Sequence, residues 1–301
     1  MRRPAVFVLA AATIVVLGVN WPIMSAGVEL VPPLWLAAFR MAGAAAVVGA
    51  VMASRGGLRR PLRSDRPILF SVGLIRLALV TALVFSALRF VPPGRSSILV
   101  YTASLWTVPF AVALLHERLT AQRIAGLALG CAGIVLLLEP WGLDWSDTQL
   151  LVGVGMLLAA AIANAVTTVH IRGHRWTGTP FELMPWQLAL AAVPITALAV
   201  IFDGAPSIRW NAETVAIVAY QVFLGSAFGL WGLITISRSL PSITTNLTLM
   251  AVPVVGLASS VVFVDEPLTA ALVLSLLLVL GGVGLGLWSD QETGEPVIPS
   301  A

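Results

Sequence analysis

The second half of this sequence repeats the first, and each half contains five hydrophobic segments. The clearest matches lie at a constant offset of 149 residues. In the first half they are Arg89, Pro92, Glu117, Leu119, Thr120 and Gly133, and in the second half Arg238, Pro241, Glu266, Leu268, Thr269 and Gly282. Arg, Glu and Pro are scarce in so apolar a chain, so these matches indicate a true repeat. Two copies of an odd number of membrane-crossing segments must be inverted relative to each other.

The match continues upstream with small changes of offset. Pro33 and Arg40 correspond to Pro180 and Gln187 at an offset of 147, and Asn20 corresponds to Asn164 at 144. We therefore predict two inverted five-helix repeats, over residues 5–139 and 149–288. The tail over 289–301 is acidic, holds two prolines and has no apolar run, so we expect it to be disordered in the cytoplasm.

Composition places the chain in a membrane. Hydrophobic residues make up 58% of it and charged residues 10%, whereas soluble domains carry about 25% charged residues. A bilayer core about 30 Å thick needs roughly 20 apolar residues per helix. Ten such stretches are present, at 6–24, 33–53, 67–88, 94–115, 121–139, 149–171, 181–202, 213–236, 242–264 and 268–288. Because the backbone must satisfy its own hydrogen bonds in lipid, the prediction is an all-α, polytopic membrane protein.

The distribution of arginine orients the chain, because short cytoplasmic loops collect basic residues. With the N-terminus inside, twelve arginines fall on the cytoplasmic side, and only Arg89, Arg95 and Arg209 on the other. We therefore expect a multi-pass protein of the plasma (inner) membrane with both termini in the cytoplasm. The basic charges lie in short loops and not on one basic face, so nucleic acid is not an expected partner.

Little in the sequence suggests a catalytic or metal-binding site. Cys131 is the single cysteine and lies inside a hydrophobic segment, so no disulfide can form within the chain. No clustered Asp, His or Cys indicates a metal site, and we expect no cofactor and no catalytic residue. A membrane-embedded transferase would need such a cluster at one membrane face. Asp265 and Glu266 are the only adjacent acidic pair, and no His lies in their loop.

Two loop sequences carry a family resemblance. They are His116-Glu117-Arg118-Leu119-Thr120 and Asp265-Glu266-Pro267-Leu268-Thr269, at corresponding turns of the two repeats. Inside two five-helix repeats with a proline-containing fourth and ninth helix, they resemble the EamA-type members of the drug/metabolite transporter superfamily. The family usually has Gly before the Glu, where this chain has His116 and Asp265. The resemblance implies a carrier of small metabolites, amino acids or drugs, many of them moved outward. It also implies a central cavity lined by helices one to four and six to nine, with helices five and ten outside it.

Two arginines lie well inside hydrophobic segments, Arg40 in the second and Arg76 in the third. A charge near the bilayer centre costs about 2.5 to 3.5 kcal/mol on insertion scales, so each should face protein or water. Arg76 is the stronger candidate for holding a substrate carboxylate or phosphate through paired N–H donors. For Arg40 the stronger alternative is that its side chain snorkels to the membrane surface or bonds helix-end carbonyls. Their repeat counterparts are Gln187 and Gly225, so this positive charge belongs to one half only.

Other polar and aromatic residues inside the segments are candidates for lining the cavity, although polar side chains also bind helices to one another. These candidates are Asn20, Trp21, Tyr101, Trp106, Asn164, Gln187, Trp231 and Asn246. Pro109 and Pro253 lie inside the fourth and ninth segments, where we expect them to loosen the helix and assist gating.

The two repeated glutamates, Glu117 and Glu266, fall at opposite membrane faces. We expect each to be structural and to cap the N-terminus of the following helix, with proton coupling as the alternative. Small residues at helical spacing, Gly126 with Gly130 and Gly282 with Gly286, permit close helix approach within the fold or in a homodimer.

Taken together, these features favour a secondary transporter that exports a small organic metabolite by alternating access. An anionic or zwitterionic compound, such as an amino acid, is the favoured substrate, and a drug is an alternative. A membrane-embedded enzyme and a non-transporting accessory protein remain as alternatives.

Overall fold

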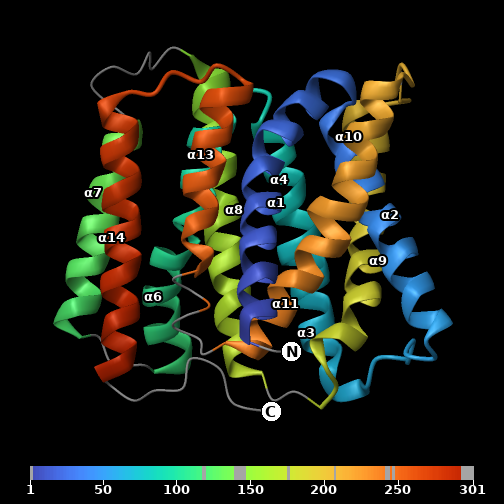
Figure 1. Cartoon of the computed structure of the whole chain (residues 1–301), viewed down its shortest axis with the longest axis horizontal. Helices are drawn as coiled ribbons and strands as arrows, with labels where there is room; N and C mark the ends of the chain where they lie inside the picture. The colour runs from blue at the N-terminus through green and yellow to red at the C-terminus, as the bar shows by residue number, and fades with distance from the viewer. Residues whose placement is uncertain are drawn as a thin grey trace.

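The computed structural model describes residues 3–116, 120–138, 147–174, 177–206, 208–240, 245 and 248–292, and within them it is built from helices without a strand. Eight helical stretches are long and apolar enough to cross a membrane, and two shorter apolar helices, Ala251–Phe263 and Ala270–Leu285, complete the set (Figure 1). The ten predicted segments correspond to these elements, nine of them with shifts of up to six residues at either end, whereas the ninth is predicted from 242 and its apolar helix begins at Ala251. The fold class predicted from the sequence is confirmed.

The elements follow the chain in a regular order. The first half consists of α1 (Arg3–Leu30), α2 (Pro33–Ser54), η1 (Arg63–Asp65), α3 (Arg66–Phe70), η2 (Ser71–Leu79), α4 (Val80–Ala87), α5 (Pro93–Tyr101), α6 (Ala103–Leu115) and α7 (Ala121–Leu138). The second half consists of α8 (Thr148–Gly173), α9 (Pro180–Leu198), η3 (Ala199–Asp203), α10 (Ala212–Val222), η4 (Phe223–Phe228), α11 (Gly229–Ser239), α13 (Ala251–Phe263) and α14 (Ala270–Glu292). Because α14 is helical through Glu292, the prediction of disorder from residue 289 is wrong for its first four residues.

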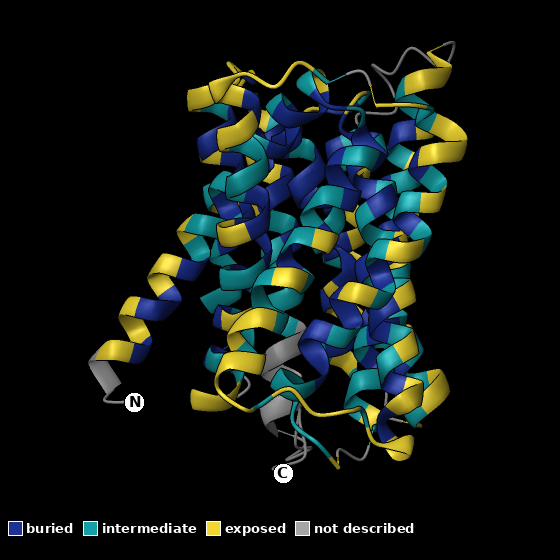
Figure 2. Cartoon of the chain, turned by 90° about the vertical axis from the view of Figure 1, so that its right-hand side faces the viewer, coloured by how far each residue is buried: buried dark blue, intermediate teal, exposed yellow. Residues whose placement is uncertain are grey.

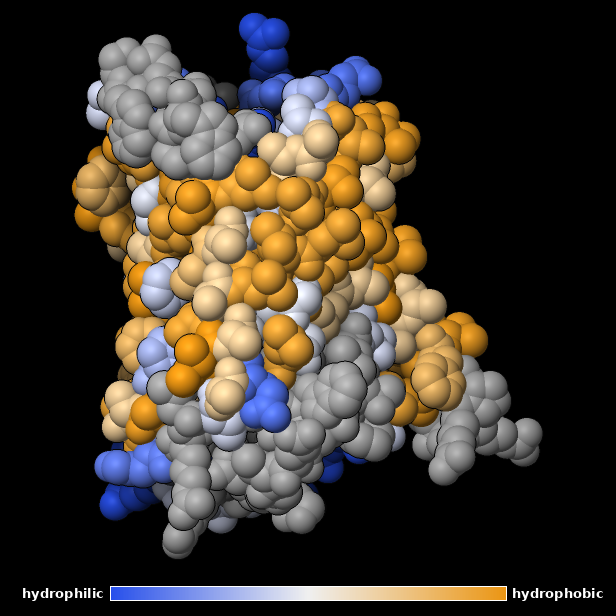
Figure 3. All heavy atoms as spheres, turned by 90° about the vertical axis from the view of Figure 1, so that its left-hand side faces the viewer, coloured by the Kyte–Doolittle hydropathy of each residue, from blue (hydrophilic) through white to orange (hydrophobic). Residues whose placement is uncertain are grey.

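Two faces of the molecule are defined by the chain ends. The terminal face is the one at which α1 begins and α14 ends, at the bottom of Figure 1, and the opposite face carries the turn between α13 and α14. Between them the outer surface is apolar: hydrophobic atoms cover the middle of the side drawn in Figure 3. Exposed side chains such as Val193, Ile201, Phe202, Val262 and Leu277 contribute to this surface. A surface of this kind suits contact with lipid chains.

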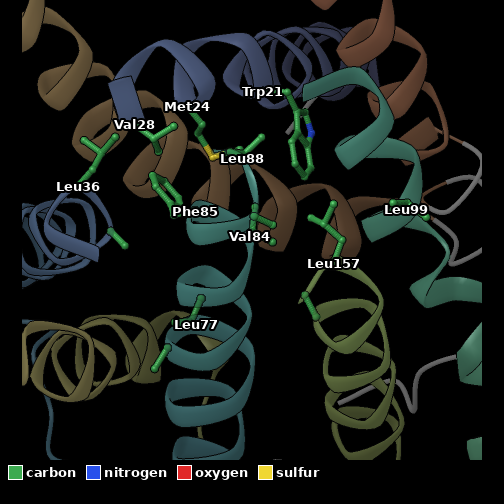
Figure 4. Close-up of a cluster of buried hydrophobic side chains, with 14 of the residues drawn as sticks. Trp21, Met24, Val28, Leu36, Leu77, Val84, Phe85, Leu88, Leu99 and Leu157 are labelled. Atoms are coloured by element: carbon green, nitrogen blue, oxygen red, sulfur yellow. The ribbon is translucent and has the colours of Figure 1, made fainter. Parts of the chain in front are cut away.

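Buried residues occupy the middle of the helix assembly (Figure 2). Large side chains from α1, α2, η2, α4, α5 and α8 meet in the main apolar cluster (Figure 4). Trp21, Met24 and Phe85 belong to it, and Phe85 is almost completely buried. This cluster forms one wall of the cavity described below.

Helices that correspond to each other in the two halves pack against corresponding partners. Helix α1 packs against α13, and its counterpart α8 packs against α6, while α2 packs against α9 and α7 against α14. Close contacts between a glycine of one half and a large side chain of the other follow the same pattern. A Cβ added at Gly43 would meet Val222 of α10, and one added at Gly73 would meet Leu190 of α9. Two copies of one five-helix unit would produce this pattern, and the repeat boundaries themselves stay a prediction from the sequence.

The glycines at helical spacing on α7 and α14 bring these two helices together within one chain. A Cβ added at Gly282 of α14 would lie 2.8 Å from Gly130 N and 3.1 Å from Gly130 Cα, and it would also meet the carbonyl oxygen of Gly126. At Gly133 it would lie 2.9 Å from Ser275 O. The backbones of α7 and α14 therefore touch, as small residues at helical spacing allow. The homodimer that the sequence leaves open stays a prediction.

The two turns that carry the family resemblance share an uncommon backbone conformation. His116 has a φ of 58° and Asp265 a φ of 52°, and they are the only non-glycine residues with positive φ in the described chain. Glycine adopts this left-handed region without steric cost. The turn geometry is therefore the physical reason for the glycine that the family usually has here, and this chain keeps the geometry with His and Asp.

For Glu266, the predicted capping of the following helix is wrong in its target. The first turn of the helix after each Glu is capped by the Thr of the same motif: Arg123 N donates to Thr120 Oγ1 at 3.2 Å and Leu272 N to Thr269 Oγ1 at 3.1 Å. Glu266 instead accepts hydrogen bonds from Gly94 N (2.7 Å) and Arg95 N (3.1 Å), in the first turn of α5 in the other half. Glu117 lies outside the described residues.

Two more carboxylates join the halves in the same manner. Asp65, which precedes α3, accepts from Thr177 N (3.2 Å) and Gly178 N (2.8 Å), just before α9. Asp203, at the end of η3, accepts from Leu34 N (2.9 Å) in the first turn of α2. Negative charge is favourable at a helix N-terminus because of the helix dipole and the unpaired N–H groups there. Asp203 and Glu266 of the second half thus cap helices of the first half, and Asp65 of the first half binds the loop before α9.

We expect Glu266→Ala to destabilise the folded protein. The carboxylate is 5% exposed, and burial raises its pKa while the N–H donors of Gly94 and Arg95 act to lower it. Its removal leaves two amides of α5 without an acceptor, at a cost of about 1–3 kcal/mol. Thermal unfolding in detergent, followed by size-exclusion chromatography, should show a lower melting temperature. The control Glu29→Ala removes an exposed carboxylate near the same face and should leave the melting temperature unchanged.

Candidate substrate cavity

A cavity of about 420 Å³ lies between the two halves. Residues of α1, α2, η2, α4, α5, α6 and α7 line it from the first half, and residues of α8, α11 and α14 from the second, together with Leu249 and Met250 before α13. Its volume lies within the range of small-molecule sites, about 300–1,000 Å³. The cavity is therefore large enough for a small metabolite.

The cavity reaches toward the terminal face. Its lining includes Arg172, next to the last residue of α8, and Arg123, the third residue of α7, and both helix ends lie at that face. At the other end the lining stops at Met24 in α1 and Val100 in α5. Beyond them, Glu266 binds the start of α5. The cavity therefore extends toward the terminal face and ends short of the opposite face.

The lining differs from the one that the resemblance implies. Helices five and ten were expected outside the cavity, but α7 contributes Arg123 and Leu127, and α14 contributes the stretch around Leu280 and Gly282. Helix seven, α9, contributes no residue to the described lining. Helix α6, which contacts both α7 and α14, contributes Ala103 and Ala111 to the same lining.

Arg76 occupies the centre of the third membrane-crossing stretch, in the π-helical turn η2. Its side chain is partly buried and lines the cavity. Within the described chain its guanidinium makes no hydrogen bond and no ion pair, and its electrostatic neighbour is Tyr101. A guanidinium carries five N–H donors in a planar fork that matches a carboxylate or phosphate. Arg76 thus presents unused donors to the cavity.

Arg40 also lines the cavity, but the protein already uses much of its hydrogen-bonding capacity. Its Nε donates to Ser226 Oγ at 2.6 Å and its Nη2 to the Gly225 carbonyl at 3.0 Å, both in η4. Nη1 lies 3.3 Å from Met24 Sδ, and the guanidinium stands over the Phe85 ring at 5.5 Å. Arg40 thus bonds the backbone carbonyl of Gly225 inside η4 and not a carbonyl at a helix end, and both roles predicted for it stay predictions. Its charge still faces the cavity.

Unpaired amides lie near these arginines. Asn20 and Asn164, the residues matched in the repeat, both line the cavity, and the Oδ1 atom of each is buried without a hydrogen-bond partner. Gln221 in α10 is fully buried, and both its Nε2 and Oε1 are unpaired. A Cβ at Gly225 would lie 2.7 Å from Asn20 Oδ1 and 3.3 Å from Gln221 Oε1, so the two amides approach the same glycine. Sequence analysis missed Gln221.

Of the remaining residues predicted to line the cavity, some do so and others lie elsewhere. Trp21 and Tyr101 line the cavity together with Phe85 and give it an aromatic wall. Trp106 has a buried, unpaired Nε1 but does not belong to the lining. Gln187 is buried between α9 and η2, and Trp231 is 42% exposed on the outside of α11, so neither lines the cavity. Asn246 lies outside the described residues.

The two prolines predicted to assist gating are inside helices. Pro109 lies within α6, and the fourth membrane-crossing stretch is interrupted at Thr102, between α5 and α6. Pro253 is buried in the first turn of α13. Their gating role stays a prediction.

Sequence analysis missed the two charged cavity residues Arg123 and Arg172. Both stand near the ends of apolar segments, where the charge pattern assigns them to the cytoplasmic loops. Only the helix direction at each site shows that they face inward. Among the residues that the structure describes, no three His, Cys, Asp or Glu side chains gather into a group that could hold a metal ion.

Comparison with known proteins agrees with this architecture. The model of the EamA-like transporter family matches residues 4–139. A "Probable amino-acid metabolite efflux pump" of Escherichia coli (strain K12) is 27% identical, over 93% of this chain and 94% of its own length. The "Aromatic amino acid exporter YddG" of Ancylobacter novellus is 30% identical, over 67% of this chain and 69% of its own.

A solved protein structure 25% identical in sequence superimposes with a TM-score of 0.66 and covers 97% of this chain and 99% of its own. The match thus extends over both halves of the fold. The chain is a multi-pass membrane protein and a transporter rather than an enzyme, and it belongs to the EamA-like transporter family of the drug/metabolite transporter superfamily.

Proposed function

We propose that this protein exports a small anionic or zwitterionic metabolite, of the size and kind of an amino acid, across the plasma membrane. The observation that carries the proposal is Arg76, whose unpaired guanidinium faces the cavity in the middle of the membrane-crossing region. A carboxylate can accept two parallel hydrogen bonds from such a group. The aromatic wall of Trp21, Phe85 and Tyr101 suits the apolar part of the substrate.

The direction in which the cavity extends supports export. The arginine distribution predicts that the terminal face is cytoplasmic, so the substrate enters from the cytoplasm and binds at Arg76. Outward release then requires closure at the terminal face and opening at the opposite face, where Glu266 now binds α5. The names of the relatives, an efflux pump and an exporter, support this direction.

Counterflow in proteoliposomes tests the proposal. Purified protein is reconstituted, the vesicles are loaded with one unlabelled amino acid or organic acid at a time, and uptake of the same labelled compound is measured. We expect saturable uptake that exceeds that of protein-free vesicles for at least one compound. Absence of saturable counterflow for every compound in a broad metabolite panel would contradict the proposal.

A further inference from the structure

The charge of the cavity lining is one-sided. Four arginines line it, Arg40, Arg76, Arg123 and Arg172, and the lining within the described chain includes neither Asp nor Glu. They come from four different helical elements, α2, η2, α7 and α8, so the positive potential extends from the middle of the membrane to the terminal face. A cavity lined by one sign of charge with low-dielectric walls concentrates ligands of the opposite sign.

Two of the four arginines have unused donors. Neither Arg76 nor Arg172 makes a hydrogen bond or an ion pair in the described chain. Arg172 stands at the mouth, in the last turn of α8, and Arg76 stands deeper, in η2. An anion entering from the terminal face therefore meets one guanidinium at the mouth and a second in the interior.

We propose that the transported compound carries a net negative charge, and that it is therefore an organic acid or an N-acylated amino acid rather than a free zwitterion. This inference rests on the proposed function and narrows its substrate class. A free ammonium group would enter a cavity whose charged lining residues are all positive. Neutral amides such as Asn164 accept a hydrogen bond but do not offset this repulsion, which strengthens as the dielectric falls.

A net anion also gives export a driving force. An inside-negative membrane potential expels negative charge, in proportion to the charge that crosses. An anion that leaves alone therefore moves outward in the direction the potential favours. Transport of a zwitterion would not respond to the potential in this way.

A charge series with a constant apolar body tests the proposal. N-acetyl-phenylalanine, phenylalanine and phenylalanine amide carry net charges of about −1, 0 and +1 near neutral pH. Matched series on leucine and alanine control for the shape of the body. We expect counterflow efficiency to fall in that order, with the N-acetyl compound about tenfold or more above the free amino acid, as repulsion of the ammonium by nearby guanidinium groups predicts.

A valinomycin-induced potassium diffusion potential supplies a second readout. Efflux of the N-acetyl compound should accelerate when the vesicle interior is made negative, and efflux of the zwitterion should not change. Arg172→Ala should weaken the preference for the anion, whereas Arg55→Ala, an exposed arginine on a loop of the same face, should leave it unchanged.

The outcomes separate the two proposals. If free amino acids show saturable counterflow equal to or above that of their N-acetyl derivatives, the transporter function holds and the net-anion inference is overturned. If the anion is preferred but Arg172→Ala and Arg55→Ala behave alike, the role of Arg172 is overturned. Absence of saturable flux for every member of the series overturns the inference and counts against the proposed function as well.

Discussion

Gly282→Leu should prevent stable packing of α14 on α7 and cause a large loss of stability. The added side chain would start 2.8 Å from Gly130 N and would meet the Gly126 carbonyl, so it collides with backbone and not with a movable side chain. Overpacking a core ordinarily costs about 1–3 kcal/mol, and a backbone collision should reach or exceed the upper end. We expect little monodisperse protein in detergent and a lower melting temperature in what remains.

Gly284→Leu is the matched control. It lies two residues further along α14, and a Cβ there meets nothing within 4 Å. Leucine is the better helix former by about 0.8 kcal/mol, so stability should be unchanged or slightly higher. Equal behaviour of the two variants in size-exclusion chromatography and thermal unfolding would show that α7 and α14 do not meet through Gly282.

Arg76→Ala should abolish most transport while leaving the fold intact. Charge-assisted hydrogen bonds are worth about 1.5–3 kcal/mol, which corresponds to a loss of roughly tenfold or more in apparent affinity. Stability should not fall, because the guanidinium has no hydrogen bond or ion pair in the described chain to lose. Counterflow as a function of substrate concentration measures the first effect, and the melting temperature measures the second.

Arg76→Lys and Arg209→Ala complete this test. Lysine keeps the charge but not the planar pair of donors, so Arg76→Lys should retain part of the affinity. Arg209→Ala removes an exposed arginine from the opposite face, outside the cavity, and should transport as the wild type does. Normal transport by Arg76→Ala would remove Arg76 from the substrate site.

Local patterns in the sequence were sufficient to predict the helices and much of the cavity. Apolar length sets each membrane-crossing segment, and a lone charge in such a segment must turn toward protein or water, which identified Arg40 and Arg76. The target of Glu266 could not be predicted, because α5 lies 172 residues earlier and only the tertiary structure brings Gly94 to it.

The full set of cavity-lining residues could not be predicted from the sequence either. Arg123 and Arg172 look like loop charges until the direction of α7 and α8 is known, and the contribution of α14 depends on how that helix packs against α6 and α7. Trp231 shows the reverse error. It lies in an apolar segment as Trp21 does, but the face of α11 that carries it points outward.

Substrate protection of a thiol in the cavity tests the central claim most directly. Ser104 lines the cavity on α6 and is exposed to it, so Ser104→Cys in a Cys131→Ala background places one reactive thiol beside the site. Ser54→Cys, on the exposed end of α2, serves as the control. A transported compound at saturating concentration should slow labelling of Ser104→Cys but not of Ser54→Cys, and Arg76→Ala should remove the protection. Labelling of Ser104→Cys at the same rate with and without that compound would contradict the claim that the substrate occupies this cavity.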